Sequence, residues 1–416
     1  MAAPVVFVTG VDPGLGVGGH SNYLRAHARA ARRAGFEPHI VCLSAQAGTT
    51  RAPFGTVHHA QVPSRRSHLP GFKAREHQMV WRVPFLARAV AHVAEVTGAR
   101  IIHGFGFYGS SGVLAARRLA GRARPVVAVT SAYDTLEREG RAKLAGITRA
   151  HGRLARWAFR VELWMNRLVV GRIERRGYAE AAQVFVNYES VRRILAESYG
   201  IVATVRNLRY ASELAFTLPQ AARTDGLAGV PGGTAPLIVT VSRQDPRKGL
   251  PVLLEALARL HREGVAFRAC LVGGGALLEP HRRLAERLGL GGVVGLPGTV
   301  AEQWPYLVAA DLFVLPSLEE GSGSLALLEA FQAGVPAVVS AVDGLLEDVT
   351  DGDNGLFALP GDAADLARVL HRALDDPALR GKLGEHARAT FEARFSADAL
   401  TRDLKAAYAD LGVEPH

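Results

Sequence analysis

The segment Leu237-Ile-Val-Thr-Val-Ser-Arg-Gln-Asp-Pro-Arg-Lys-Gly-Leu250 decides the fold of the second half of this chain. Its apolar beginning, Leu237 to Val241, is rich in β-branched residues and predicts a buried strand. A polar loop with Arg243 and Lys248 follows, and the periodic leucines of residues 250–260 predict an amphipathic helix. A strand that leads into a helix through such a loop is the repeating unit of a doubly wound parallel sheet. Such sheets bind ligands at the carboxyl ends of their strands.

The same alternation extends in both directions from this segment. Short apolar runs that alternate with amphipathic helices indicate a parallel sheet covered on both faces. The chain is therefore predicted to be an α/β protein with two doubly wound, Rossmann-like domains. In the second half, strands are predicted at residues 267–272, 293–294, 311–315 and 335–340, with helices from Glu279, near Ala301 and through Glu329. In the first half, strands are predicted at 5–9, 38–43, 101–103 and 125–130, with helices at 21–33 and 111–119.

Length and composition also indicate two folded domains. At 416 residues the chain exceeds the size of one typical hydrophobic core, and 48% hydrophobic with 21% charged residues is typical of globular proteins. The segment 217–236, rich in Gly, Pro, Ala and Thr, is the predicted linker between a domain at 1–216 and one at 237–390. No run reaches the ~18 apolar residues of a membrane-spanning helix. The first residues lack a basic leader, so a cytoplasmic protein is expected.

The net charge of +10 is scattered along the chain and does not indicate a nucleic-acid-binding protein. No RNP motif, zinc-finger spacing or continuous basic arm accompanies it. Cys42 and Cys270 each lie in an apolar run, so both are predicted to be buried hydrophobic residues, without a disulfide or a metal. Thiols of this kind fit a reducing cytosol.

Residues 136–180 differ from the rest of the first half, because they are helical in pattern and rich in Arg. One interpretation is an amphipathic helix that packs its apolar stripe on the core. The alternative is a membrane-surface or lipid-acceptor patch that includes Trp157 and Trp164. This alternative would bring the protein to the inner face of a membrane.

A glycine-rich stretch, Gly14-Leu-Gly-Val-Gly-Gly19, follows the first predicted strand. It formally contains the G-x-G-x-x-G pattern of dinucleotide-binding enzymes. However, the glycines begin five residues beyond the strand, and the second strand ends in Val41-Cys-Leu-Ser44, without a carboxylate for ribose. The stretch is better suited to let an anion approach a helix N-terminus, and a tight turn without a ligand is the simpler alternative.

Cationic and acidic side chains in the second half suit a nucleotide sugar. Arg243 can hold a phosphate through two parallel hydrogen bonds, and Lys248 adds a compact charge. The stretch Pro316-Ser-Leu-Glu-Glu-Gly-Ser-Gly-Ser324 precedes a predicted helix and offers backbone N–H groups for a diphosphate. The carboxylates of Glu320 and Glu329 would repel phosphate but accept hydrogen bonds from sugar hydroxyls.

In order and spacing, these motifs resemble the retaining glycosyltransferases of family 4, which have GT-B architecture. The likeness covers nearly all of the second half, and the first half matches through Gly18-Gly19 and the segment around His103. It implies two Rossmann-like domains that face each other across a cleft, with a C-terminal helix at 391–416 that crosses back to the first domain. The matching stretches are Val241-Ser-Arg243…Lys248-Gly249, Leu271-Val-Gly273-Gly-Gly275, Asp311-Leu-Phe-Val-Leu-Pro-Ser317, Glu320-Gly…Leu-Leu-Glu329-Ala, Asp351-Gly…Asn354-Gly355-Leu and Arg394-Phe-Ser396.

The resemblance assigns roles to individual residues. Arg243 and Lys248 would hold the donor diphosphate and stabilise the charge that develops in the reaction. Because both lie at a strand end, their substitution is expected to leave the fold nearly intact. Glu329 would bind ribose, and Glu320 would act next to the transferred sugar. Further donor contacts are expected from Gly18, Gly19, Gly323, Ser324 and Leu325, and acceptor contacts from His103, Ser131 and Asp134.

Three features depart from the family pattern. Eight residues separate Glu320 from Glu329 where the family has seven, so the stretch Pro316–Ser324, the glycine loop, carries one more residue. Ser322 lies between the loop glycines, where the family often has an aromatic or a small residue. Many members have a histidine after the strand at 125–130, where this chain has Ser131, so a histidine role is not carried over.

The resemblance implies transfer of a sugar from a nucleoside-diphosphate sugar, with a UDP-sugar favoured, to an acceptor hydroxyl with retention. The acceptor would be a small molecule, a glycan or a lipid-linked sugar. No cofactor or metal is expected, because Arg243, Lys248 and a helix N-terminus would stabilise the leaving diphosphate and no Asp-x-Asp pair stands at a strand end. Two alternatives stay open: an NAD-dependent enzyme that uses residues 14–19, and a non-catalytic protein that binds nucleotide sugars.

We predict that the donor nucleotide binds without a divalent metal, because Arg243 and Lys248 supply the positive charge. Calorimetric titration of UDP into the protein should give the same affinity in EDTA as in magnesium or manganese. Loss of UDP binding in EDTA, with recovery when either metal is restored, would contradict this prediction.

Overall fold

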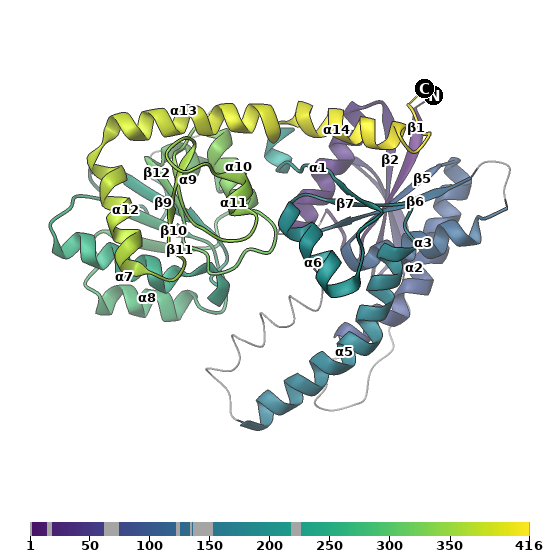
Figure 1. Cartoon of the computed structure of the whole chain (residues 1–416), viewed down its shortest axis with the longest axis horizontal. Coiled ribbons are helices and arrows are strands. Elements are labelled where there is room, and N and C mark those ends of the chain that lie inside the picture. The colour runs from purple at the N-terminus through teal and green to yellow at the C-terminus, as the bar shows by residue number, and fades with distance from the viewer. Residues whose placement is uncertain are drawn as a thin grey trace. The chain divides into compact units, whose positions relative to one another are not determined.

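The computed structural model describes residues 2–14, 19–61, 75–121, 125–133, 135, 153–217 and 226–415. The chain forms two compact units. Unit 1 contains Met1–Glu213 and Ala397–His416, and unit 2 contains Leu214–Ser396. Each unit is built on its own sheet (Figure 1). The segment 217–236, expected to be a linker, falls within unit 2, and its residues 218–225 lie outside the described ones.

The sheet of unit 2 has the strand order of a doubly wound dinucleotide-binding domain. Its described strands follow the order β11-β10-β9-β12-β13-β14, and all neighbours pair in parallel. The order changes direction between β9 and β12, so the loops after these two strands flank the place where such sheets bind ligands. The strands are β9 Leu237–Val241, β10 Arg268–Val272, β11 Val294–Gly298, β12 Leu312–Leu315, β13 Ala337–Ser340 and β14 Gly355–Ala358.

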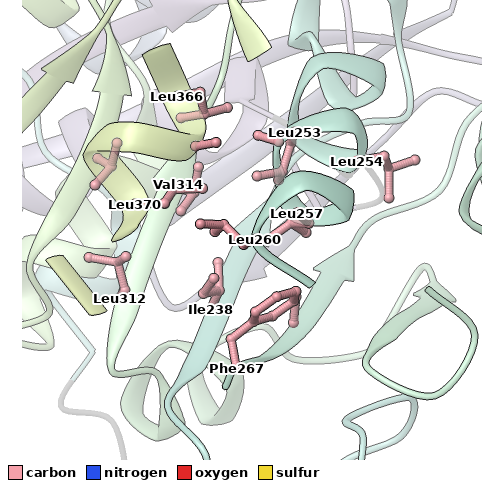
Figure 2. Close-up of a cluster of buried hydrophobic side chains, with 14 of the residues drawn as sticks. Ile238, Leu253, Leu254, Leu257, Leu260, Phe267, Leu312, Val314, Leu366 and Leu370 are labelled. Atoms are coloured by element: carbon pink, nitrogen blue, oxygen red, sulfur yellow. The ribbon is translucent and has the colours of Figure 1, made fainter. Parts of the chain in front are cut away.

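A leucine-rich core covers one face of this sheet (Figure 2). Leu253 and Leu257 of α7 pack in one buried cluster with Ile238 of β9 and Leu370 of α12. Burying a leucine is worth about 1.5–3 kcal/mol, so this stripe fixes α7 and, with it, the loop that leads into α7. The helices of unit 2 are α7 Leu250–Arg262, α8 Leu278–Arg287, α9 Trp304–Ala309, α10 Leu325–Gln332, α11 Leu345–Asp348, α12 Ala363–Asp375 and α13 Pro377–Arg394.

The sheet of unit 1 is parallel except at one edge. Its described strands follow the order β3-β4-β2-β1-β5-β6-β7-β8, in which β3 runs antiparallel to β4. This hairpin was not predicted from the sequence, because β3 is polar and mostly exposed and has no apolar run. The strands are β1 Ala3–Val8, β2 Phe36–Ser44, β3 Gly48–Ala52, β4 Gly55–Gln61, β5 Ile101–Phe105, β6 Val127–Ala132, β7 Gln183–Val186 and β8 Val205–Asn207.

The helices of unit 1 include a long one in the Arg-rich region. Residues 136–180 were expected to be helical. Within this range α5 covers Arg153–Ala179, and residues 136–152 lie outside the described ones. No helix in the described parts of the chain has the length and apolar character needed to cross a membrane. Cys42 and Cys270 are buried and free, as predicted. The helices are α1 Gly19–Arg33, α2 Arg75–Thr97, α3 Gly109–Arg118, α5 Arg153–Ala179, α6 Glu189–Tyr199 and α14 Ala397–Ala409.

The C-terminal helix α14 is part of unit 1 and packs on α1. The hydroxyl of Tyr408 on α14 lies 2.7 Å from Nδ1 of His103 on β5, and the hydroxyl of Ser131 on β6 lies 2.8 Å from Nε2. All three side chains are fully buried. Since both ring nitrogens are bonded, His103 joins the C-terminal helix to the centre of the sheet.

Unit 1 is expected to lose stability in mild acid. His27 and His103 are fully buried, and burial lowers the pKa of His27 to about 4 and that of His103 well below its usual value. Below a pH of about 6.5 the unfolded chain binds protons that the folded unit excludes. The free energy of unfolding should therefore fall by up to about 1.4 kcal/mol per pH unit for each histidine.

Thermal unfolding between about pH 7 and about pH 4, followed by hydrogen exchange of β1 and β5, measures this loss. The control is His386→Gln, which removes a histidine of unit 2 whose side chain is 43% exposed. This substitution should leave the pH dependence of the free energy of unfolding of unit 1 unchanged. A stability of unit 1 that stays constant over this range would refute the assignment of two neutral buried histidines.

Candidate functional site

Loops of unit 2 meet at the carboxyl ends of its central strands. Residues 242–249 follow β9, residues 273–277 follow β10, and residues 316–324 follow β12. Backbone hydrogen bonds join these loops: Gln244 N–H donates to the carbonyl of Gly274 at 2.9 Å, and Leu318 N–H donates to that of Arg247 at 2.7 Å. The loops therefore form one continuous edge at the reversal of strand order.

Gly249 allows the loops after β9 and β12 to touch. Its φ is 64°, and a Cβ atom there would lie 1.9 Å from the carbonyl oxygen of Pro316. Any other residue would meet both the strained backbone and the clash. Just before it, Asp245 accepts a hydrogen bond from Arg247 N–H at 3.0 Å and starts the short helix η3, Pro246–Lys248. Lys248 is thus held at the point where the two loops meet.

This contact brings Lys248 and Glu320 together, two of the residues selected from the sequence. The Lys248 Nζ atom lies 2.7 Å and 2.8 Å from the two carboxylate oxygens of Glu320, and Ser317 Oγ donates to Glu320 Oε1 at 2.5 Å. The side chain of Lys248 is 16% exposed and that of Glu320 only 4%. The pair therefore places one positive and one negative charge, largely screened from water, beside the glycine loop.

Burial of this pair argues against the expectation that substitution of Lys248 would leave the fold nearly intact. Removing one partner of a buried ion pair costs about 3–5 kcal/mol, because the other charge is left uncompensated. Loss of Lys248 would leave the buried carboxylate of Glu320 without a counter-charge. Arg243 is exposed, so its substitution is still expected to leave the fold intact.

Asp343, in the loop after β13, holds the glycine loop from the other side. Its Oδ2 atom accepts hydrogen bonds from the backbone N–H groups of Glu320 and Gly321, both at 2.8 Å. A Cβ atom on Gly344 would lie 2.7 Å from the Gly323 nitrogen, so the two loops are in close backbone contact. Two of the N–H groups that the sequence analysis reserved for a diphosphate are therefore bonded to a carboxylate.

Glu329 lies on α10, whose first turn follows the glycine loop. The carboxylate is buried, with 1% of the residue exposed, and its Oε2 accepts a hydrogen bond from Gln303 Nε2 at 2.9 Å. Ser324 precedes the helix without capping it through its side chain. The N–H groups of a first turn have no acceptor within their helix, so those at Leu325 and the residues after it face the loop.

Two of the three glycines after β10 have a structural role that the sequence motif did not specify. Gly273 has a φ of 133°, and its Cβ would lie 1.9 Å from the carbonyl oxygen of Ser242. Gly275 has a φ of 148°, and its Cβ would lie 2.6 Å from that of Gln244. These residues let the loop after β10 lie directly against the loop that carries Arg243.

In unit 1, the sequence-selected residues have different surroundings. Gly19 is the first residue of α1, and Gly18 and Asp134 lie outside the described residues. His103 and Ser131 are bonded to each other and fully buried. An acceptor could touch these two side chains only if their network opened, so their acceptor role stays a prediction.

Sequence reasoning missed Asp343 and Gln303. Asp343 follows the strand predicted at 335–340, and the rule that ligand sites lie at the carboxyl ends of parallel strands could have selected it. Its φ of 46°, the one positive value outside glycine among the described residues, is not visible in a sequence. Gln303 precedes a short helix, and no pattern marks it.

Two family models match this chain. The model described as Glycosyltransferase Family 4 matches residues 17–206, and the model described as Glycosyl transferases group 1 matches residues 230–390. The first match lies within unit 1 and the second within unit 2. Together they take in most of both units.

Curated relatives match over part of the chain. The lipopolysaccharide core biosynthesis glycosyltransferase LpsE of Rhizobium meliloti is 35% identical over 167 residues, which are 40% of this chain and 48% of LpsE. The GDP-mannose-dependent alpha-(1-6)-phosphatidylinositol monomannoside mannosyltransferase of Mycolicibacterium smegmatis is 34% identical over 165 residues, 37% of this chain and 43% of the relative. The chain thus spans less than half the length of each of these relatives.

Solved structures match over nearly the whole chain. Sucrose-phosphate synthase from Thermosynechococcus elongatus has a TM-score of 0.72 at 22% identity and covers 99% of both chains. HepE of Anabaena, solved with UDP-glucose, has a TM-score of 0.68 at 17% identity and covers 98% of this chain and 99% of its own. At these identities the likeness shows the fold, and it confirms the predicted GT-B class with two Rossmann-like domains.

Because Lys248 and Glu320 form a buried pair, we predict that substitutions at this pair and at a surface pair lower the stability of unit 2 by different amounts. Lys248→Met should lower the free energy of unfolding of unit 2 by about 3 kcal/mol, because Glu320 is left without its counter-charge. The double variant Lys248→Met with Glu320→Gln should recover part of this loss. The control Glu279→Gln breaks the pair with Arg282, in which both side chains are 40% exposed or more, and should change stability by less than about 1 kcal/mol.

Hydrogen exchange of β9 and β12 in the four proteins measures these differences within unit 2. Equal losses in Lys248→Met and in Glu279→Gln would show that the pair contributes no more than a surface ion pair. A double variant that is less stable than Lys248→Met would contradict the coupling of the two charges.

Proposed function

Because the chain belongs to the glycosyltransferases of group 1 and family 4, we propose that it transfers a sugar from a nucleoside-diphosphate sugar to an acceptor hydroxyl. The observation that carries this proposal is the buried pair of Lys248 and Glu320 beside the start of α10, at the reversal of strand order. This place joins a cation for phosphate to a carboxylate for sugar hydroxyls.

The bound donor would separate Lys248 from Glu320 and give each of them a new partner. A diphosphate oxygen would accept hydrogen bonds from Lys248 Nζ, and the exposed guanidinium of Arg243 would approach the same group. Glu320, released from Lys248, would then accept hydrogen bonds from the transferred sugar. Glu329 would reach the ribose by exchanging its bond with Gln303 for one with a ribose hydroxyl.

The transfer step breaks the bond between the anomeric carbon and the diphosphate oxygen, and the diphosphate leaves with the electron pair. The acceptor oxygen forms the new bond on the same face of the sugar, which gives retention. The acceptor proton passes to an oxygen of the leaving diphosphate, so the atoms and charges balance without a separate base. Lys248, Arg243 and the first turn of α10 stabilise the negative charge where it develops. We propose that no metal is required for this stabilisation.

The donor and the acceptor follow from chemistry shared with related proteins. HepE of Anabaena was solved with UDP-glucose, and the Mycolicibacterium relative is described as GDP-mannose-dependent. We propose a UDP-sugar as donor and a sugar or lipid-linked sugar as acceptor, as the lipopolysaccharide core function of LpsE suggests. An NAD-dependent reaction is not supported, because the second strand has no ribose carboxylate and the family models are those of glycosyltransferases.

We also propose that unit 1 contacts a membrane through α5. Trp157, Arg160, Trp164 and Arg167 are exposed and recur every three or four residues, so they share one face of the helix. Trp157 is 67% exposed and Trp164 62%. Tryptophan and arginine on one helix face suit the headgroup layer of an anionic membrane. The protein would then act at the cytoplasmic face of that membrane, on a lipid-linked acceptor.

Arg243→Ala should lower the rate of sugar transfer about 100-fold or more, as loss of one charge-stabilising donor does in other enzymes. The assay measures nucleoside diphosphate released from UDP-, GDP-, ADP- and TDP-sugars, first by hydrolysis and then with candidate acceptors. The control is Arg283→Ala, which removes an exposed arginine of α8 in the same unit and should leave the rate unchanged.

One result would overturn the proposed function, and two would overturn the role of Arg243. Full transfer by Arg243→Ala would remove this residue from the site. Tight binding of nucleotide sugars with no turnover of any donor would favour the non-catalytic alternative. An equal loss in Arg283→Ala would mean that net charge, and not position, matters.

The membrane proposal predicts binding to anionic vesicles. The protein should co-sediment with vesicles of phosphatidylglycerol and much less with phosphatidylcholine, and Trp157→Ser with Trp164→Ser should lower the bound fraction severalfold. Leu346→Ser is the control, because it removes an apolar side chain of unit 2 that is 53% exposed. Undiminished binding by the double tryptophan variant would contradict the proposal.

A further inference from the structure

Asp12, Cys42 and His59 lie together in unit 1, and no step of the proposed transfer uses them. Cys42 on β2 and His59 on β4 are directly paired in the parallel register, and Asp12 lies in the loop after β1. One ligand atom of each residue lies within 4.8 Å of the other two. We propose that these three side chains form a binding site for a thiophilic divalent cation, with Zn²⁺ or Co²⁺ as the fitting ions.

Two of the three distances between the ligand atoms match those of a tetrahedral metal site. A tetrahedral Zn²⁺ with bonds of about 2.3 Å to sulfur, about 2.05 Å to nitrogen and about 2.1 Å to oxygen would separate sulfur from nitrogen by about 3.6 Å and nitrogen from oxygen by about 3.4 Å. Cys42 Sγ lies 3.6 Å from His59 Nδ1, and Asp12 Oδ2 lies 3.4 Å from the same nitrogen. Both distances match the tetrahedral values, and the third, between Cys42 Sγ and the Asp12 carboxylate, is at most 4.8 Å.

The surroundings of His59 suit a metal ligand. Its Nε2 atom lies 3.0 Å from Thr50 Oγ1 on β3. Metal-bound histidines usually donate the other ring N–H to such an acceptor, which directs the free lone pair to the metal. With Nε2 protonated in this way, Nδ1 points its lone pair at Cys42 and Asp12. The hairpin of β3 and β4 thus supplies both His59 and its hydrogen-bond partner Thr50.

The site is enclosed but accessible. Cys42 is fully buried, while the side chain of His59 is 13% exposed and that of Asp12 17%. Three protein ligands leave the fourth position of a tetrahedral ion for water or another small ligand, as in zinc sites that are not purely structural. Binding converts the Cys42 thiol to a thiolate, and its proton is released to the solvent, so the charges balance.

A cation here would fix the loop after β1. The second oxygen of Asp12, Oδ1, accepts a hydrogen bond from Gly14 N–H at 2.8 Å. Asp12 would thus link the metal to the start of the glycine stretch, while Cys42 and His59 anchor it to two strands. The site differs from the sequence-based expectation that Cys42 is only a buried hydrophobic residue, and it lies in the unit that does not contain Lys248 and Glu320.

Titration of the full chain with Co²⁺, followed by absorption spectroscopy, tests the proposal. One equivalent of Co²⁺ should produce a thiolate-to-cobalt charge-transfer band and the intense visible bands of a tetrahedral ion, and Zn²⁺ should displace it. Cys42→Ser should abolish the charge-transfer band. Asp12→Asn and His59→Gln should each weaken binding by about 100-fold or more, since even loss of an outer partner costs 10–100-fold at such sites.

Matched controls come from the same chain. Cys270→Ser removes the other buried cysteine, which lies in unit 2, and His58→Gln removes the histidine next to His59 on β4. Both should bind Co²⁺ as the parent does. UDP affinity and thermal unfolding of every variant show that it is folded, and Zn²⁺ should raise the unfolding temperature of the parent and of the controls but not of Cys42→Ser.

Three outcomes would overturn the metal site. They are the absence of stoichiometric Co²⁺ binding by the parent, a charge-transfer band that persists in Cys42→Ser, and equal Co²⁺ affinity in the parent, Asp12→Asn and His59→Gln. Because UDP binding is measured on the same samples, a failure of the metal site can be told apart from a failure of the proposed transferase function.

Discussion

Direct backbone contact between the loops after β9 and β12 is the constraint on which the candidate site depends. The carbonyl of Pro316 occupies the space that a side chain at residue 249 would need, and the left-handed φ of Gly249 turns the chain into α7 immediately afterwards. The buried leucines of α7 hold this helix on the sheet, and the loop that leads into it is thereby kept near the loop after β12. The position of Lys248 against Glu320 is thus a consequence of main-chain packing.

The glycine loop is held by a cation on one side and by a carboxylate on the other. Lys248 bonds the side chain of Glu320, while Asp343 bonds the backbone N–H groups of Glu320 and Gly321. A diphosphate bound by Lys248, as proposed above, would compete with the carboxylate of Glu320. The arrangement keeps the loop ordered before a ligand is present, which reduces the conformational entropy that binding must overcome.

Much of unit 2 could be predicted from its sequence, because its strands are short apolar runs between polar loops. The strand at Leu237–Val241 has the predicted bounds, and the predicted start of α7 at Leu250 agrees with the structure. The pairing of Lys248 with Glu320 could not be predicted, because it depends on how closely two loops approach. The hairpin of β3 and β4 also escaped prediction, since β3 lacks the apolar alternation that identifies a half-buried strand. The meeting of Cys42 with His59 follows from the register of β2 and β4, and a register between strands is not visible in either strand alone.

Unit 1 is assembled from two separate stretches of the chain, and this sets the order in which it is completed during synthesis. A ribosome makes His103 long before Tyr408, which lies 305 residues further along. All of unit 2 emerges between them, as one uninterrupted segment with its own core. Domains generally fold as units during translation, so the later segment can finish folding while the earlier one still lacks its last helix. The sheet of unit 1 is therefore completed only after α14 has been synthesised.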